Sequence, residues 1–69
     1  MKLIRTINRD NNFYRTELKD FEIFKNQLIL QSKEKVNGFN VEKYTNYKEV
    51  FLYFYDSKNN LNEVQVMAN

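Results

Sequence analysis

The strongest β-forming segment of the chain reads Glu49-Val50-Phe51-Leu52-Tyr53-Phe54-Tyr55-Asp56. Its central residues are all β-branched, aliphatic or aromatic, the types that favour a pleated and half-buried surface. A polar cluster at residues 56–60 follows, and an apolar–polar alternation resumes at residues 64–68. Two runs of this kind joined by a short polar loop predict a β-hairpin.

The spacing of the apolar residues also predicts how the two strands pair. If Tyr55 lies opposite Leu61, then Leu52 lies opposite Val64 and Val50 lies opposite Val66, because side chains along a strand alternate between its two faces. The hairpin then has an aliphatic face and an aromatic face. The residues of the aliphatic face are Val50, Leu52, Phe54, Val64, Val66 and Ala68. The residues of the aromatic face are Phe51, Tyr53, Tyr55, Leu61 and Met67, with Glu63 and Gln65 among them.

The aromatic face needs a cover. Three aromatic side chains present roughly 450–750 Å² of apolar surface. The largest exposed apolar patch of a typical monomer is only about 300–600 Å². We therefore expect this face to be covered by residues 1–16 of the same chain, by a second copy of the chain, or by a foreign partner.

The N-terminal part of the chain shows strand and turn signals. Residues 2–8 are predicted to form a strand, residues 9–12 a turn, and residues 13–16 a short returning strand. Residues 39–47 are predicted to form either a strand that leads into the main hairpin or a loop with one irregular turn.

Residues 17–35 are predicted to form one long helix. Leu18, Phe21 and further apolar residues fall on one side of a helical wheel. Thr16 is an acceptable N-cap residue, and Gly38 stands just beyond the expected end of the helix, where glycine is common.

The competing interpretation of this stretch is a hairpin. Residues 37–38 read Asn-Gly, which is the strongest short signal for a two-residue hairpin turn. Val36 would then lie opposite Phe39, and Lys33 would lie opposite Glu42. The apolar residues fit strand alternation less well than helical spacing, so the helix is the favoured interpretation.

Together these elements predict a single small α+β domain spanning residues 1–69. The expected architecture is an antiparallel sheet with one long helix, at about residues 17–35, packed on one face. We expect the helix to cover the aliphatic face and to leave the aromatic face free. The alternative is an all-β meander or a small open barrel, in which the sheet curls to cover itself.

The composition narrows the classes of function. Without Cys or His, the chain lacks disulfides, the usual zinc and haem ligands, and the commonest catalytic base and nucleophile. The acidic pairs Asp20/Glu22 and Asp56/Glu63 are interpreted as solvated surface groups. We therefore expect a protein that is not an enzyme and that holds no cofactor and no metal.

The charge pattern and hydropathy point to a cytoplasmic protein. The net charge is only +2, and basic residues alternate with acidic ones instead of forming a block. No apolar run approaches the roughly 20 residues of a membrane span. Arg5 interrupts the first apolar residues, so no signal-peptide core is expected.

These observations favour a small protein-binding module that docks through its aromatic face, with a homodimer as a plausible form of self-association. Interface centres are rich in Tyr, Phe and Met. The frequent Asn and Lys residues suggest an AT-rich coding sequence, and hence a phage or mobile-element accessory protein that inhibits or modulates a host protein. The predicted partner-binding residues are Phe51, Tyr53, Tyr55, Tyr44, Tyr47 and Met67.

The alternative function is binding of single-stranded nucleic acid. Phe51, Tyr53 and Tyr55 would then act as a stacking platform for bases. Such a platform needs cationic side chains beside it to contact the phosphates. Glu63 lies on the predicted face instead, and its carboxylate argues against nucleic-acid binding. The candidate cations are Arg5, Arg9, Arg15, Lys48 and Lys58.

Overall fold

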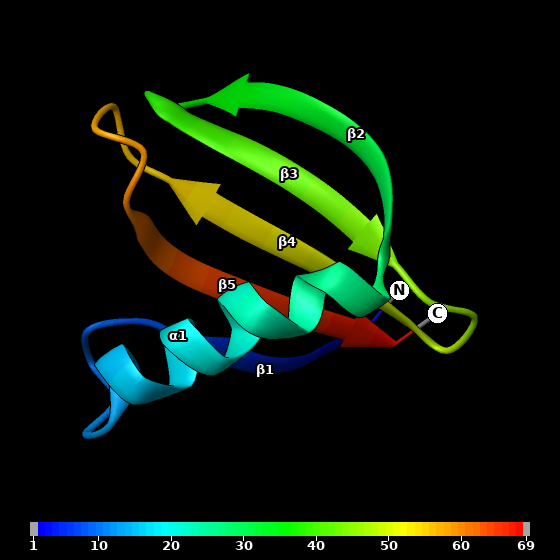
Figure 1. Ribbon diagram of the computed structural model, residues 1–69, viewed down its shortest axis with the longest axis horizontal. Helices are drawn as coiled ribbons and strands as arrows, with labels where there is room; N and C mark the ends of the chain where they lie inside the picture. Colours follow the sequence, from blue (N-terminus) through cyan, green and yellow to red (C-terminus); the bar gives the residue numbers. More distant parts are fainter. Residues whose placement is uncertain (1, 69) are drawn as a thin grey trace.

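The computed structural model describes residues 2–68, which form an open five-stranded antiparallel sheet with one helix on one face (Figure 1). The strand order is β1-β5-β4-β3-β2, so that β4 lies at the centre and β1 and β2 lie at the edges. The predicted α+β architecture is confirmed, and the all-β alternative is wrong because a helix is present. The elements are β1 (Lys2–Ile7), α1 (Tyr14–Phe24), the 3₁₀ turn η1 (Lys25–Gln27), β2 (Ile29–Val36), β3 (Phe39–Thr45), β4 (Glu49–Tyr55) and β5 (Leu61–Ala68).

The hairpin of β4 and β5 forms where the sequence predicts it, but its register differs beyond the turn. Tyr55 lies opposite Leu61 as predicted, whereas Phe54 lies opposite Glu63, so Asn62 is an extra residue in β5. This β-bulge shifts every later pair by one residue. The predicted pair of Leu52 and Val64 is therefore wrong, and the same holds for Val50 and Val66.

The shifted register places the aromatic residues of β4 beside the valines of β5. Tyr53 now lies opposite Val64, and Phe51 lies opposite Val66. This face is the buried one, because α1 packs on it and lies across β5 and β1 (Figure 1). The prediction that the helix covers the aliphatic face and leaves the aromatic face free is wrong. The buried core consists of Ile7, Leu18, Phe51, Tyr53, Tyr55, Val64 and Val66.

The stretch predicted as one long helix divides into a helix and a strand. Helix α1 begins at Tyr14, η1 ends at Gln27, and β2 starts at Ile29. The predicted strand at residues 13–16 is wrong, because three of these residues form the first turn of α1. Thr16 lies within that helix and is not its N-cap.

The hairpin interpretation is correct for the second half of this stretch. Val36 lies opposite Phe39 and Lys33 opposite Glu42. Asn37 and Gly38 connect the strands with φ angles of +50° and +84°. Positive φ at both central residues is typical of a type I′ turn, which matches the twist of the flanking strands. The third strand, β3, is the predicted strand that leads into the main hairpin.

Truncation of the central ring should unfold the protein. Tyr53 is completely buried, so Tyr53→Ala should lower the free energy of unfolding by about 3–5 kcal/mol. A core of this size supplies only about 3–5 kcal/mol of net stability, so the variant should be largely unfolded at room temperature. Urea unfolding followed by circular dichroism measures the effect.

The matched control is Tyr47→Ala, because the Tyr47 side chain is 87% exposed. This change should alter the free energy of unfolding by less than about 0.5 kcal/mol. Equal stability of the two variants would contradict the burial of Tyr53 under α1.

Candidate binding face

The sheet face opposite α1 is called the open face here, because no other element among residues 2–68 packs on it. Alternation along the strands brings the other side chains of β4 to this face, together with their partners on β3, β5 and β2. Its centre is an apolar stripe along β4, and Lys43 of β3 and Gln65 of β5 lie on either side of Leu52. The apolar residues of the face are Leu3, Ile29, Val36, Phe39, Val41, Val50, Leu52, Phe54 and Met67.

Crowding between neighbours partly shields the centre of the open face. Val41 and Val50 are only 8% and 4% exposed, although neither belongs to the core beneath α1. Phe39 packs edge-on against Phe54, with ring centroids 6.4 Å apart. Val36 and Phe39 remain 40% and 36% exposed. The open face is therefore a preformed apolar surface whose margins are accessible to solvent.

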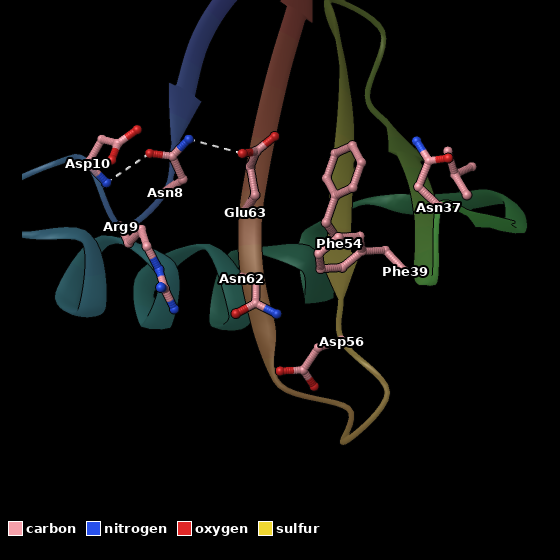
Figure 2. Close-up of a pocket in the computed structure, with 10 residues that line it drawn as sticks. Asn8, Arg9, Asp10, Asn37, Phe39, Phe54, Asp56, Asn62 and Glu63 are labelled. Carbon is pink, nitrogen blue, oxygen red and sulfur yellow. Dashed lines mark hydrogen bonds between the residues drawn. The ribbon is translucent and has the colours of Figure 1, made fainter.

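Two hollows mark the open face. A shallow hollow of about 310 Å³ lies over the middle strands and is lined by Val41, Leu52 and Met67, among others. A larger groove of about 680 Å³ lies at the end where the β1–α1 loop, the β2–β3 turn and the β4–β5 turn meet (Figure 2). Val36 and Phe54 line both hollows, so the two are continuous.

The groove has one apolar side and one polar side (Figure 2). Val36, Phe39 and Phe54 form the apolar side. The polar side comes from the β1–α1 loop, from the start of β5 and from the β4–β5 turn. Its residues are Asn8, Arg9, Asp10, Asp56, Asn62 and Glu63, and Asn37 stands at the margin.

Hydrogen bonds fix two of the groove carboxylates. Glu63 accepts a hydrogen bond of 3.0 Å from the Asn8 side-chain amide (Figure 2). It accepts a second one of 2.7 Å from the Gln65 side-chain amide. Asp56 accepts hydrogen bonds of 2.9 Å from the backbone N–H groups of Lys58 and Asn60. The hydrogen bond from the Asn60 backbone, with weaker contributions from neighbouring groups, holds the pKa of Asp56 below its usual value.

The aromatic residues predicted to bind a partner lie mostly in the core. Phe51, Tyr53 and Tyr55 are 3%, 0% and 4% exposed, so they offer neither a docking surface nor a stacking platform. Tyr44 packs edge-on against Tyr53 on the same covered face. These rings are buried because the bulge in β5 places Val64 and Val66 on the same face as Phe51 and Tyr53. That face is then the more apolar one, and α1 covers it.

The two remaining predicted partner-binding residues lie elsewhere. Tyr47 is exposed in the β3–β4 turn, at the opposite end of the sheet from the groove (Figure 1). Met67 lies on the open face and lines the shallow hollow. The sequence analysis did not select the groove residues. The hairpin interpretation of residues 36–39 contains a signal for them, since it places Val36 beside Phe39.

A polar network anchors the end of α1 to the covered face. The Tyr53 hydroxyl donates to the backbone carbonyl of Phe21 at 2.7 Å. The Tyr55 hydroxyl donates to Glu22 at 3.0 Å and accepts from the Lys25 ammonium at 2.6 Å. The Lys25 ammonium also lies 4.8 Å from the centre of the Tyr55 ring. These contacts satisfy the buried phenols and orient the helix end on the sheet.

The network changes the acidity of its tyrosines. Burial, followed by the hydrogen bond to Glu42, raises the pKa of Tyr44 to about 12. Burial is also the main reason why the pKa values of Tyr53 and Tyr55 are raised well above the usual value of tyrosine. Raised values keep the hydroxyls protonated as donors, so this cluster is a structural feature and lacks a poised base.

The candidate nucleic-acid contacts do not converge on one surface. Arg5 pairs with Glu17 of α1 and lies 5.8 Å from the centre of the Phe21 ring. Lys48 lies in the β3–β4 turn, at the other end of the sheet from Arg9, Arg15 and Lys58 (Figure 1). Arg15 begins α1 and stacks on Tyr14.

A search for metal sites, for membrane-spanning helices and for similar proteins gives no further guide to the function. Residues 2–68 contain no group of three or more acidic side chains placed to hold a metal ion. None of the helices within that range is long and apolar enough to cross a membrane. Comparison of the chain with protein-family models, with curated proteins and with solved structures found no match.

The tyrosine network predicts a loss of stability in alkaline solution. The folded-state pKa of Tyr44, about 12, lies above the unfolded value of about 10. The folded protein therefore holds this proton more tightly, and the resulting stability is complete below pH 10 and is lost between about pH 10 and 12. Tyr53 and Tyr55 act in the same direction. Urea unfolding midpoints at pH 8, 10 and 11.5 should fall across this series.

The variant Tyr55→Phe serves as the control for this prediction. It removes one of the titrating hydroxyls, so the midpoint should depend less on pH above 10, although the variant is less stable at pH 8. An unchanged midpoint of the parent protein from pH 8 to 11.5 would contradict the raised pKa values.

Proposed function

We propose that this protein is a small, non-enzymatic binding module that docks onto a protein partner through the open face. The observation that carries the proposal is the apolar stripe along β4 on that face, with Lys43 and Gln65 on either side of Leu52, which no element of residues 2–68 covers. Val41, Leu52 and Phe54 form its middle, where a second layer would normally pack. A partner would supply this second layer.

The open face has the size of a small protein interface. Five strands about 4.8 Å apart, each about seven residues long at roughly 3.3 Å per residue, span on the order of 450 Å². Standard protein complexes bury about 800 Å² on each partner, and the smaller transient ones bury less than about 600 Å². Polar groups flank the apolar stripe on both sides, with Gln65 and Thr6 toward β1 and Lys43 and Ser32 toward β2. An interface likewise has a polar rim around an apolar centre.

Docking of this kind matches a protein that acts by occupying the surface of another protein. Helix and sheet form a rigid support, so little conformational order has to be gained on binding. The proposal retains the origin expected from the Asn and Lys usage, in which a phage or mobile-element protein of the cytoplasm modulates a host protein. The proposed docking surface is the open face, in place of the aromatic face that the sequence predicted.

Charge placed at the centre of the open face should abolish partner capture. Leu52→Lys introduces a second ammonium group opposite Lys43 and interrupts the apolar stripe of β4, where a docked partner would exclude its water. The tagged variant should capture at least tenfold less of any specific partner from a lysate of a low-GC bacterium. Circular dichroism should show that it remains folded, because a half-buried lysine can extend its charge to solvent.

The matched control is Ile23→Lys, which places the same charge on an exposed position of α1. This variant should capture the same partner as the parent protein. Equal capture by both variants would overturn the proposal. The parent protein could instead have a solution mass of twice 8.5 kDa, and the Leu52→Lys variant the mass of a single chain. That result would identify a second copy of the chain as the molecule that covers the open face.

A further inference from the structure

The groove on the open face carries a charge opposite to that of the whole protein. The chain has a formal net charge of +2. The groove instead brings together the carboxylates of Asp10, Asp56 and Glu63 with a single guanidinium, that of Arg9. Its lining is therefore formally negative by two charges, and it lies directly beside the apolar Phe39–Phe54 pair.

None of the three groove carboxylates is neutralised within residues 2–68. The ion pairs of this part of the chain are Arg5–Glu17, Lys25–Glu22 and Lys25–Glu42, all on the helix side of the sheet. Arg9 extends away from the Asp10 carboxylate (Figure 2). The three carboxylates also do not form a group that could hold a metal ion. Their charge is therefore available to separate cationic groups of a ligand.

We infer that this groove receives a basic, apolar segment of the partner protein, with its apolar side chains on Phe39 and Phe54 and its Lys or Arg side chains toward Asp10 and Glu63. The inference rests on the proposed docking function and adds the chemistry of the partner. Complementary charge of this kind selects partners and sets their orientation. The groove volume of about 680 Å³ lies within the range of roughly 300–1,000 Å³ that binding pockets occupy.

The same charge argues against the other macromolecular ligands. A nucleic-acid backbone would bring phosphates toward three carboxylates and would release no counterions from them. An acidic peptide meets the same repulsion. A basic segment gains from both sides of the groove, because its aliphatic stems cover the rings while its charged ends reach the polar side.

Peptide titration tests the inference directly. The probes are a short synthetic peptide that alternates leucine and lysine, a counterpart with glutamate for lysine, and a counterpart with serine for leucine. Amide NMR spectra of the labelled protein should shift at Phe39, Phe54 and Glu63 with the leucine–lysine peptide. The other two peptides should bind at least tenfold more weakly, and added salt should weaken the leucine–lysine complex.

Two double variants separate local from overall charge. D10N/E63Q removes two groove carboxylates and should weaken binding of the leucine–lysine peptide about fivefold to tenfold, as expected for two partly exposed ion pairs. D20N/E49Q removes the same charge from α1 and from the start of β4, on the helix side of the sheet, and should leave binding within about twofold. Both variants retain neutral side chains of the same shape, so the fold should survive.

The outcomes distinguish this inference from the proposed function. Equal affinity for the lysine and glutamate peptides would overturn the inference that the groove receives a basic segment. Equal loss of peptide affinity in the two double variants would do the same. If Leu52→Lys loses the cellular partner while D10N/E63Q keeps it, docking through the open face stands and the inferred chemistry fails. If both variants keep the partner, the proposed function fails as well.

Discussion

The unpaired residue in β5 controls which surface of this protein is core and which is exposed. Asn62 has no partner on β4, so the strand advances by one residue between Leu61 and Glu63. Since strand side chains alternate with a period of two, this single residue brings Val64 and Val66 to the side of the aromatic rings. The helix then covers the most apolar surface available. The other side of β4 becomes the open face.

The aromatic core in turn places demands on the helix. A buried phenol needs a hydrogen-bond partner, and the last turn of α1 supplies one to each of two tyrosines, Tyr53 through the Phe21 carbonyl and Tyr55 through Glu22 and Lys25. Lys25 opens the 3₁₀ turn that follows and is held by these contacts as well. Anchoring the helix end at this point leaves the chain only a short connection before β2.

The sequence predicts the class of fold and the main hairpin because these depend on local patterns. Residues 50–55 favour a strand whatever their surroundings, and the polar cluster that follows requires a turn. The register could not be predicted in this way, because a bulge is a tertiary feature with no distinct local signal at Asn62. The open face follows from the bulge, and this is why the sequence predicted the wrong side of β4 to be free of the helix.

Residues 17–35 show a second limit of local pattern. Their apolar spacing is helical up to Leu28, and the strand Ile29–Val36 has mostly exposed side chains with little alternation to reveal it. In the sequence, only the Asn-Gly pair at residues 37–38 indicates the hairpin, because these two residue types tolerate positive φ angles. The structure shows positive φ at both residues. The groove could not be read from the sequence for a related reason. Asp10, Asp56 and Glu63 come from three separate segments, and only the sheet topology brings them beside Phe39 and Phe54.

An apolar run without alternation is typical of a strand that is buried on both of its faces. In this protein β4 is such a run, yet α1 covers only one side of it. A solvated face would normally carry polar residues at positions 52 and 54. This chain has Leu52 and Phe54 there instead. In the proposed complex, apolar contact along β4 would supply affinity without fixing direction, because it depends mainly on the area removed from water. The negatively charged groove at one end would supply the direction, since a partner with a basic segment would then dock in only one orientation along the strands.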